Sequence, residues 1–170
     1  MFYFLDHDDS NSADLSISGK DYVSLIDTCF RYSVYFSLNI GFLRRKSISI
    51  DLPKPYRIVE NCKLPSINAD IAILPCSETT REYMLHRVED LFEWIDWYNN
   101  PEDLIFYRQD GSIFFWSLIH EGVCCLVNRP QEDVTHIVSS STWYEYSREQ
   151  HPVFYIPNGI ADFKLNCADA

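Results

Sequence analysis

The chain has 170 residues, of which 46% are hydrophobic and 15% are aromatic, and this composition excludes an intrinsically disordered chain. The formal net charge of −11 disfavours direct binding to nucleic acid or to a membrane surface, where lysine and arginine supply much of the affinity. We therefore expect a single globular domain over residues 1–170, with residues 1–17 and 166–170 mobile.

The first half of the chain alternates between helical and extended patterns. The spacing of Ser18 and Asp21 predicts the start of a helix. Polar and apolar residues alternate from 32 to 40, which predicts a one-sided strand, although continuation of the helix through Phe36 is the competing interpretation. The other elements expected before residue 78 are a basic loop at 41–46, a strand at 47–52 and a short buried strand at 71–74.

Residues 79–98 predict a long amphipathic helix with two opposite faces. At about 100° per residue, its apolar side must be buried, and this side holds Met84, Val88, Leu91, Ile95 and Tyr98. The opposite side forms what we call the acidic ridge, which consists of Glu82, Glu89, Glu93 and Asp96. No lysine or arginine interrupts this ridge, so we expect it to face water or a basic partner.

The clearest β signal is a meander at residues 104–128. Asp110 and Gly111 predict a hairpin with a type I′ turn, because both residue types tolerate a positive φ. Pairing across this turn places Ile113 and Phe114 on opposite faces of the sheet, with Ile113 beside Phe106. Both faces are apolar, so both are expected to be covered.

The rest of the chain is less regular but consistent with the same fold class. Pro130 and Glu132 resemble a helix start, and residues 153–156 predict a late edge strand. The expected fold is α+β, a mainly antiparallel sheet whose meander at about 104–128 is packed by the long amphipathic helix at about 79–98.

No motif for catalysis or metal binding is present. The chain lacks the histidine pairs of zinc proteases, a Cys-x-x-Cys pair and a Gly-x-Ser-x-Gly elbow. His120 lies close to Cys124 in sequence, yet hairpin geometry is sufficient to explain this spacing. We expect no catalytic residue, no metal and no cofactor. No signal peptide is visible either, so a cytoplasmic protein with reduced cysteines is expected.

Two groups of aromatic and acidic residues suit a protein partner rich in arginine or lysine. Trp97 follows Glu93 by one helical turn, and a second group holds Trp143, Tyr144 and Glu145. Rings supply buried area and cation–π attraction at such interfaces. The alternative for each group is that its ring completes the core, since tryptophan is largely buried in most folds.

In general character the chain resembles the bacterial immunity proteins that protect a cell from its own polymorphic or contact-delivered toxin, as in contact-dependent growth inhibition. The features behind this resemblance are the compact acidic domain, the acidic ridge and the ring-rich run of Phe114, Phe115 and Trp116. The resemblance implies a protein that is not an enzyme and that neutralises a cognate toxin, often a basic nuclease domain, by protein–protein interaction.

Two other functions remain open from the sequence. The first is a small cytosolic enzyme or ligand-binding domain with a pocket between sheet and helices. The second is an acidic mimic of nucleic acid, against which the stretch at 28–58 counts, because it holds six basic residues and one acidic residue.

Overall fold

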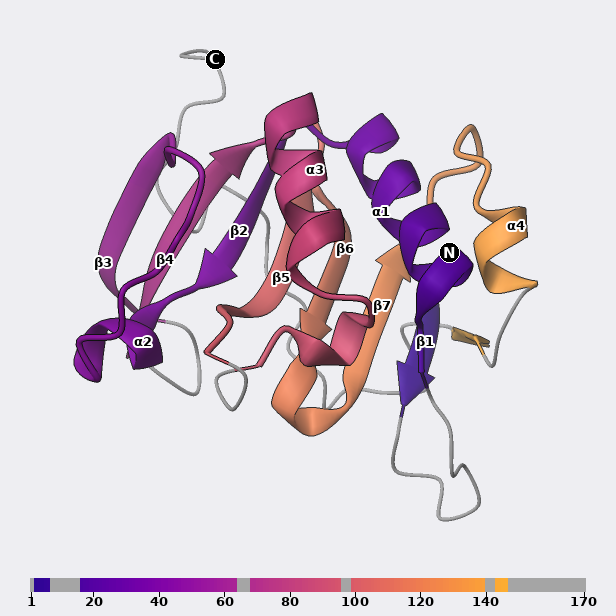
Figure 1. The fold of residues 1–170 in the computed structure, drawn as a ribbon. Coiled ribbons are helices and arrows are strands. Elements are labelled where there is room, and N and C mark those ends of the chain that lie inside the picture. The colour runs from indigo at the N-terminus through magenta and orange to yellow at the C-terminus, as the bar shows by residue number, and fades with distance from the viewer. Residues whose placement is uncertain (1, 7–15, 64–67, 96–98, 140–142, 147–170) are drawn as a thin grey trace.

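The computed structural model describes residues 2–6, 16–63, 68–95, 99–139 and 143–146 (Figure 1). The strands in these residues are β1 (Phe2–Asp6), β2 (Tyr35–Asn39), β3 (Arg57–Lys63), β4 (Asn68–Pro75), β5 (Glu102–Tyr107), β6 (Ile113–Leu118), β7 (Val123–Val127) and β8 (Tyr144–Tyr146). They form one sheet in the order β3-β4-β2-β5-β6-β7-β1-β8, and every neighbouring pair is antiparallel. Helices pack against this sheet, so the predicted α+β class and the meander are confirmed.

The helices that matter most for the surface are α1 (Gly19–Tyr32) and α3 (Glu78–Arg87), which lie next to each other in front of the central strands in Figure 1. The shorter helical elements are α2 (Gly41–Arg45), η1 (Leu91–Glu93), η3 (Ile119–Glu121) and α4 (Thr135–Val138). The predicted start of a helix after Ser18 is confirmed, and the helix continues to Tyr32.

Both faces of the meander are buried, as its apolar pattern predicted. The face toward the helices belongs to the larger core cluster, whose fully buried members include Leu25, Phe36, Met84, Leu91, Trp94, Phe106, Phe115 and Leu126. The opposite face contributes a second cluster with Tyr35, Ile73, Tyr107, Trp116 and Cys125. The β2 strand is buried along its whole length, so the predicted one-sided exposure is wrong. Its second face is also covered, because Tyr35 belongs to the second cluster and packs against the Tyr56 ring, and Ser37 forms a hydrogen bond with Tyr107.

The hairpin between β5 and β6 differs from the predicted type I′ turn. Gly111 has a φ of 79°, but the φ of Asp110 is not positive, and the Gly111 amide donates to the carbonyl of Arg108 at 2.9 Å. A turn followed by a left-handed glycine is the usual form of a three-residue hairpin loop. A bulge at Phe114 also places it on the helix-facing side and Ile113 on the other, which reverses both predicted faces.

The predicted helix at 79–98 ends at Arg87 instead. Val88 is extended, and the backbone that follows pairs with the segment before α1, because the Glu89 carbonyl accepts from Gly19 (3.1 Å) and the Leu91 amide donates to Ile17 (3.0 Å). A new 3-10 turn, η1, then starts at Asp90. Tertiary hydrogen bonds have therefore replaced three helical residues, 88–90, with an extended link.

Several smaller expectations also need correction. The predicted basic loop at 41–46 contains the short helix α2, and the predicted strand at 47–52 has no strand structure. Residues 2–6 were expected to be mobile, yet they form β1 between β7 and β8. The predicted strand at 153–156 lies outside the described residues.

Candidate functional site

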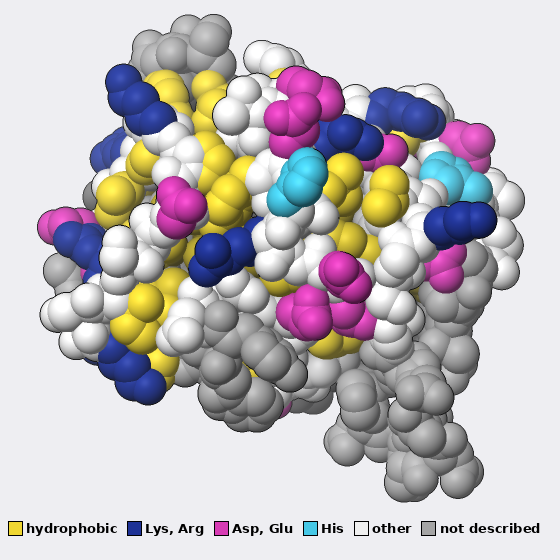
Figure 2. Space-filling model, in the orientation of Figure 1, with side chains coloured by type: hydrophobic (Ala, Val, Ile, Leu, Met, Phe, Trp, Pro, Cys, Tyr) yellow, Lys and Arg dark blue, Asp and Glu magenta, His cyan; other side chains and the backbone are white. Residues whose placement is uncertain are grey.

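The acidic ridge does not lie on one helix, because α3 ends before most of its members. Glu82 is exposed on α3, whereas Glu89 is exposed in the extended link between α3 and η1. Figure 2 shows acidic side chains gathered below the centre of the face that carries α1 and α3. Within the described part of the chain, neither the Glu82 nor the Glu89 side chain has an ion pair or a hydrogen bond. Both carboxylates are therefore available to a partner.

Glu93 has a different role, which the sequence pattern did not reveal. One oxygen of its carboxylate, Oε2, accepts from the Glu89 amide at 2.9 Å and from the Asp90 amide at 3.3 Å. Asp90 in turn accepts from the Phe92 amide, so Asp90 and Glu93 form a capping box at the start of η1. The Glu93 carboxylate thus holds the extended link, and its predicted contact with a partner stays a prediction.

The remaining predicted site residues are placed in part. Asp96 and Trp97 lie outside the described residues. Trp143 is half-buried and packs against the larger core cluster, which favours the alternative that its ring completes the core. Tyr144 and Glu145 lie in β8 at one edge of the sheet, and Glu145 is exposed. The second aromatic and acidic group therefore lies at the β8 edge of the sheet, next to β1.

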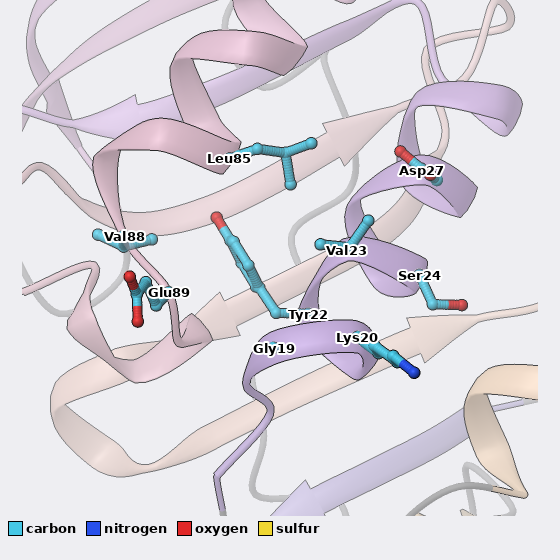
Figure 3. Close-up of a pocket in the computed structure, with 9 residues that line it drawn as sticks. All are labelled: Gly19, Lys20, Tyr22, Val23, Ser24, Asp27, Leu85, Val88 and Glu89. Atoms are coloured by element: carbon cyan, nitrogen blue, oxygen red, sulfur yellow. The ribbon is translucent and has the colours of Figure 1, made fainter.

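A groove lies between α1 and α3, next to Glu89 (Figure 3). It is open to solvent and has a volume of about 580 Å³. Its lining residues are Gly19, Lys20, Tyr22, Val23, Ser24, Asp27, Leu85, Val88 and Glu89. In Figure 3, the Leu85 side chain and the Tyr22 ring project into the space between the two helices. A predominantly apolar groove thus opens beside an unpaired carboxylate.

The floor of this groove is rigid because its polar groups are satisfied. The Tyr22 hydroxyl accepts from Trp94 Nε1 at 2.9 Å and donates to the Met84 carbonyl at 3.2 Å. Burial raises the pKa of Tyr22 well above its usual range, so the phenol stays protonated and does not act as a base. The groove can bind a ligand, but the described lining residues offer no nucleophile activated by a base for a reaction on that ligand.

Most of the groove residues were missed by the sequence analysis. Val23 and Lys20 lie outside the buried stripe of α1, and only the packing of α1 against α3 brings them near Leu85. The signal available in the sequence was Val23, an apolar residue that lies outside the stripe of buried positions in this helix. Val23 is indeed 40% exposed.

A second cluster of titratable side chains lies where β5 begins and β6 ends. One possible ligand atom from each of Glu102, Asp103 and His120 lies within 4.8 Å of the others. Asp103 has a positive φ of 55° and a buried carboxylate, which accepts from the Ile119 amide at 3.2 Å. His120 is exposed, and its Nδ1 is 3.8 Å from Asp103. The clearest role of Asp103 is to hold the reversal between β6 and β7.

Replacing Asp103 with asparagine should change how stability depends on pH. Burial raises the pKa of Asp103, and this outweighs the lowering effects of His120 and of the bond from Ile119. The folded chain therefore binds this proton more tightly than the unfolded chain, and the carboxylate destabilises the fold increasingly as pH rises through its folded pKa. In urea titrations, the free energy of unfolding of Asp103→Asn should rise relative to that of the natural chain as pH increases from about 4, the ordinary pKa of aspartate.

Asp133 is the matched control, because hydrogen bonds with Thr135 lower its pKa. Relative to the natural chain, Asp133→Asn should lose free energy of unfolding by an amount that is constant above about pH 4 and shrinks as pH falls below it. A constant difference between Asp103→Asn and the natural chain at every pH would show that the Asp103 carboxyl titrates alike in the folded and unfolded states.

Four cysteines are free thiols, namely Cys29, Cys76, Cys124 and Cys125. Burial raises the pKa of each of them. A thiol attacks as its thiolate, so these groups are poor nucleophiles. The predicted behaviour of cysteine as a small buried hydrophobe fits the buried positions of Cys29, Cys124 and Cys125.

Comparison with known proteins adds no relative, since no family model, no curated protein and no solved structure matches the chain. Among the described residues, no helix combines the length and the apolar character needed to cross a bilayer.

Proposed function

We propose that this protein is an immunity protein that binds and neutralises a cognate, basic toxin domain, for example a nuclease. The observation that carries the proposal is the pair of exposed carboxylates on α3 and directly after it. In the described residues, the side chains of Glu82 and Glu89 have no partner within the chain, whereas the Asp27 carboxylate is paired with Arg81 at 2.6 Å. A carboxylate that is not neutralised internally keeps its full attraction for a cationic partner.

A nuclease offers a surface of the opposite charge. It must hold phosphate groups, and lysine and arginine supply that affinity, so its substrate-binding face is basic. A net charge of −11 on the immunity protein accelerates encounter with such a face. An inhibitor that occupies this face excludes the nucleic acid, and it needs no catalytic residue or cofactor to do so.

The distribution of basic residues favours a protein partner over mimicry of nucleic acid. Arg45 and Lys46 are exposed at the end of α2, and Figure 2 shows several basic side chains along the edge of the molecule that holds α2 and β3. A mimic of nucleic acid would present acids without such cations, because they would repel the phosphate-binding surface of its target.

Charge reversal at both carboxylates tests this function. First, the chain is used as bait to capture binding partners from a lysate of the source cells. Each captured domain is then expressed in cells, with and without the chain, and the inhibition of growth is measured. With the purified domain, Glu82→Lys combined with Glu89→Lys should weaken binding on the order of tenfold or more at low ionic strength. The difference should shrink at high salt, since screening weakens exposed charge pairs.

The matched control reverses two exposed carboxylates elsewhere, Glu60→Lys in β3 combined with Glu121→Lys in η3, and so makes the same change in net charge. If both double variants bind the toxin domain equally well, the surface at α3 is not the interface. If no captured domain inhibits growth, or if co-expression of the chain does not relieve inhibition, the proposed function is wrong.

The alternative function, a small enzyme or ligand-binding domain, has one observation in its favour. Asp103 is a buried carboxylate with a raised pKa next to the exposed His120, an arrangement common at functional sites. An activity of the chain that is lost in Asp103→Asn and kept in Glu89→Gln would support this alternative.

A further inference from the structure

We propose that the groove between α1 and α3 binds an arginine side chain of the partner. Its guanidinium would lie against the Glu89 carboxylate, and its methylene groups against Val23, Leu85 and Val88. The basic character of the partner rests on the proposed function, whereas the fit of an arginine rests on the groove itself.

The walls of the groove suit a long aliphatic stem. Val23 is one of three large hydrophobic side chains that are exposed in the described residues, and the other two, Tyr56 and Ile58, lie at or next to β3. The volume of about 580 Å³ falls within the range of about 300–1,000 Å³ that is usual for ligand sites. Arginine buries its methylene groups along apolar surfaces while its charged end stays polar.

Glu89 is held in place before any partner arrives. Its amide donates to Glu93 Oε2 at 2.9 Å, and its carbonyl accepts from the Gly19 amide at 3.1 Å. Gly19 has a φ of 55°, and a Cβ at that position would meet nothing within 4 Å, so the groove stays open at this end. Because the backbone of Glu89 is fixed on both sides, only the rotamer freedom of its side chain is lost when its carboxylate meets a cation.

The charges along the groove leave Glu89 as its unneutralised acid. The other charged lining residues are Lys20 and Asp27, and Asp27 is already paired with Arg81. In Figure 3 the amino group of Lys20 points away from Glu89, and no ion pair joins the two. The groove therefore presents an apolar wall that ends in a carboxylate.

Arginine fits this arrangement better than lysine. A carboxylate can accept two parallel hydrogen bonds from a guanidinium, and the guanidinium is more weakly hydrated than an ammonium group. It therefore loses less solvation when it lies against an apolar wall.

An NMR titration of the full chain tests the inference without the toxin. The probe is a capped pentapeptide with arginine at its centre and leucine on each side, and matched peptides carry lysine, glutamine or glutamate instead. The arginine peptide should shift the amide signals of Val23, Leu85, Val88 and Glu89 most, and the glutamate peptide should not bind there. Glu89→Gln should weaken binding of the arginine peptide by about fivefold, whereas Glu82→Gln, which removes an equal charge outside the groove, should not.

Each other outcome overturns the inference. Shifts centred elsewhere, equal binding of the glutamate peptide, tighter binding of the lysine peptide, or no binding by any peptide would each exclude an arginine site in the groove. The two proposals can fail separately. If Glu89→Gln neutralises and binds the toxin as tightly as the natural chain, the groove inference fails and the proposed function stands. If the peptides bind as expected and no toxin is neutralised, the proposed function fails instead.

Discussion

Replacing Glu132 with alanine should destabilise the fold by about 3–5 kcal/mol, because it leaves Arg108 charged and unpaired in the interior. The two side chains are buried, and Arg108 Nε and Nη2 donate to the two carboxylate oxygens at 2.6 and 2.7 Å. Arg108 also donates to the Val127 carbonyl, so the pair connects the residue after β5 with β7 and with the segment before α4. Urea unfolding followed by circular dichroism measures the loss.

Two further variants separate the burial of charge from the loss of contacts. Arg108→Met combined with Glu132→Leu removes both charges and should recover most of the lost stability, since a hydrophobic pair of similar volume avoids the desolvation of both ions. Glu60→Ala breaks an exposed pair with Arg44 at 2.9 Å and should change stability by less than about 1 kcal/mol. If Glu132→Ala lowers the free energy of unfolding by no more than Glu60→Ala does, then water reaches Arg108 and the ion pair is not desolvated.

The meander of the sheet was predictable because it follows from local patterns, whereas the position of β1 in the sheet was not. Alternating apolar residues and turn residues define β5, β6 and β7, and both faces are buried as expected. The face of the sheet on which Ile113 or Phe114 lies could not be predicted in this way. A bulge shifts the register by one residue, and a strict period of two cannot anticipate it.

The end of α3 shows why a correct burial pattern can predict the wrong helix. Val88, Leu91 and Ile95 are buried as the helical period required, yet the backbone is extended at Val88 and resumes as a 3-10 turn. The signal that marks the break was present, since Asp90 and Glu93 have the spacing of a capping box. What the sequence could not show is that the link forms hydrogen bonds with the segment before α1.

This break decides the character of the candidate site. On a continuous helix, Glu89 and Glu93 would be equivalent members of one ridge. In the structure, Glu93 holds the backbone of the link, and Glu89 lies at the rim of a groove whose other wall is α1. Contacts between α1 and α3 arise only in the folded chain, so no local pattern could have assigned Val23 and Leu85 to one surface.

Replacing Trp94 with alanine should cost about 3–5 kcal/mol of stability, the usual loss when a large aromatic is removed from a core. Trp94 is fully buried, packs near the Tyr83 ring at 6.1 Å between centroids, and donates to the Tyr22 hydroxyl. The substitution leaves a cavity under the groove and removes the bond that orients Tyr22. Guanidinium unfolding followed by far-ultraviolet circular dichroism measures this loss and does not depend on tryptophan fluorescence.

Tyr22→Phe separates the hydrogen bond from the cavity. It keeps the ring but leaves Trp94 Nε1 and the Met84 carbonyl without their shared partner, which should cost about 1–3 kcal/mol. Because Trp94 and Tyr22 share one bond, the double variant should lose less than the sum of the two single losses. If the losses of stability in the two single variants add up to the loss in the double variant, then Trp94 stabilises the fold through its volume alone. The floor of the groove would then be held by packing, and Tyr22→Phe should leave the affinity for the arginine peptide unchanged.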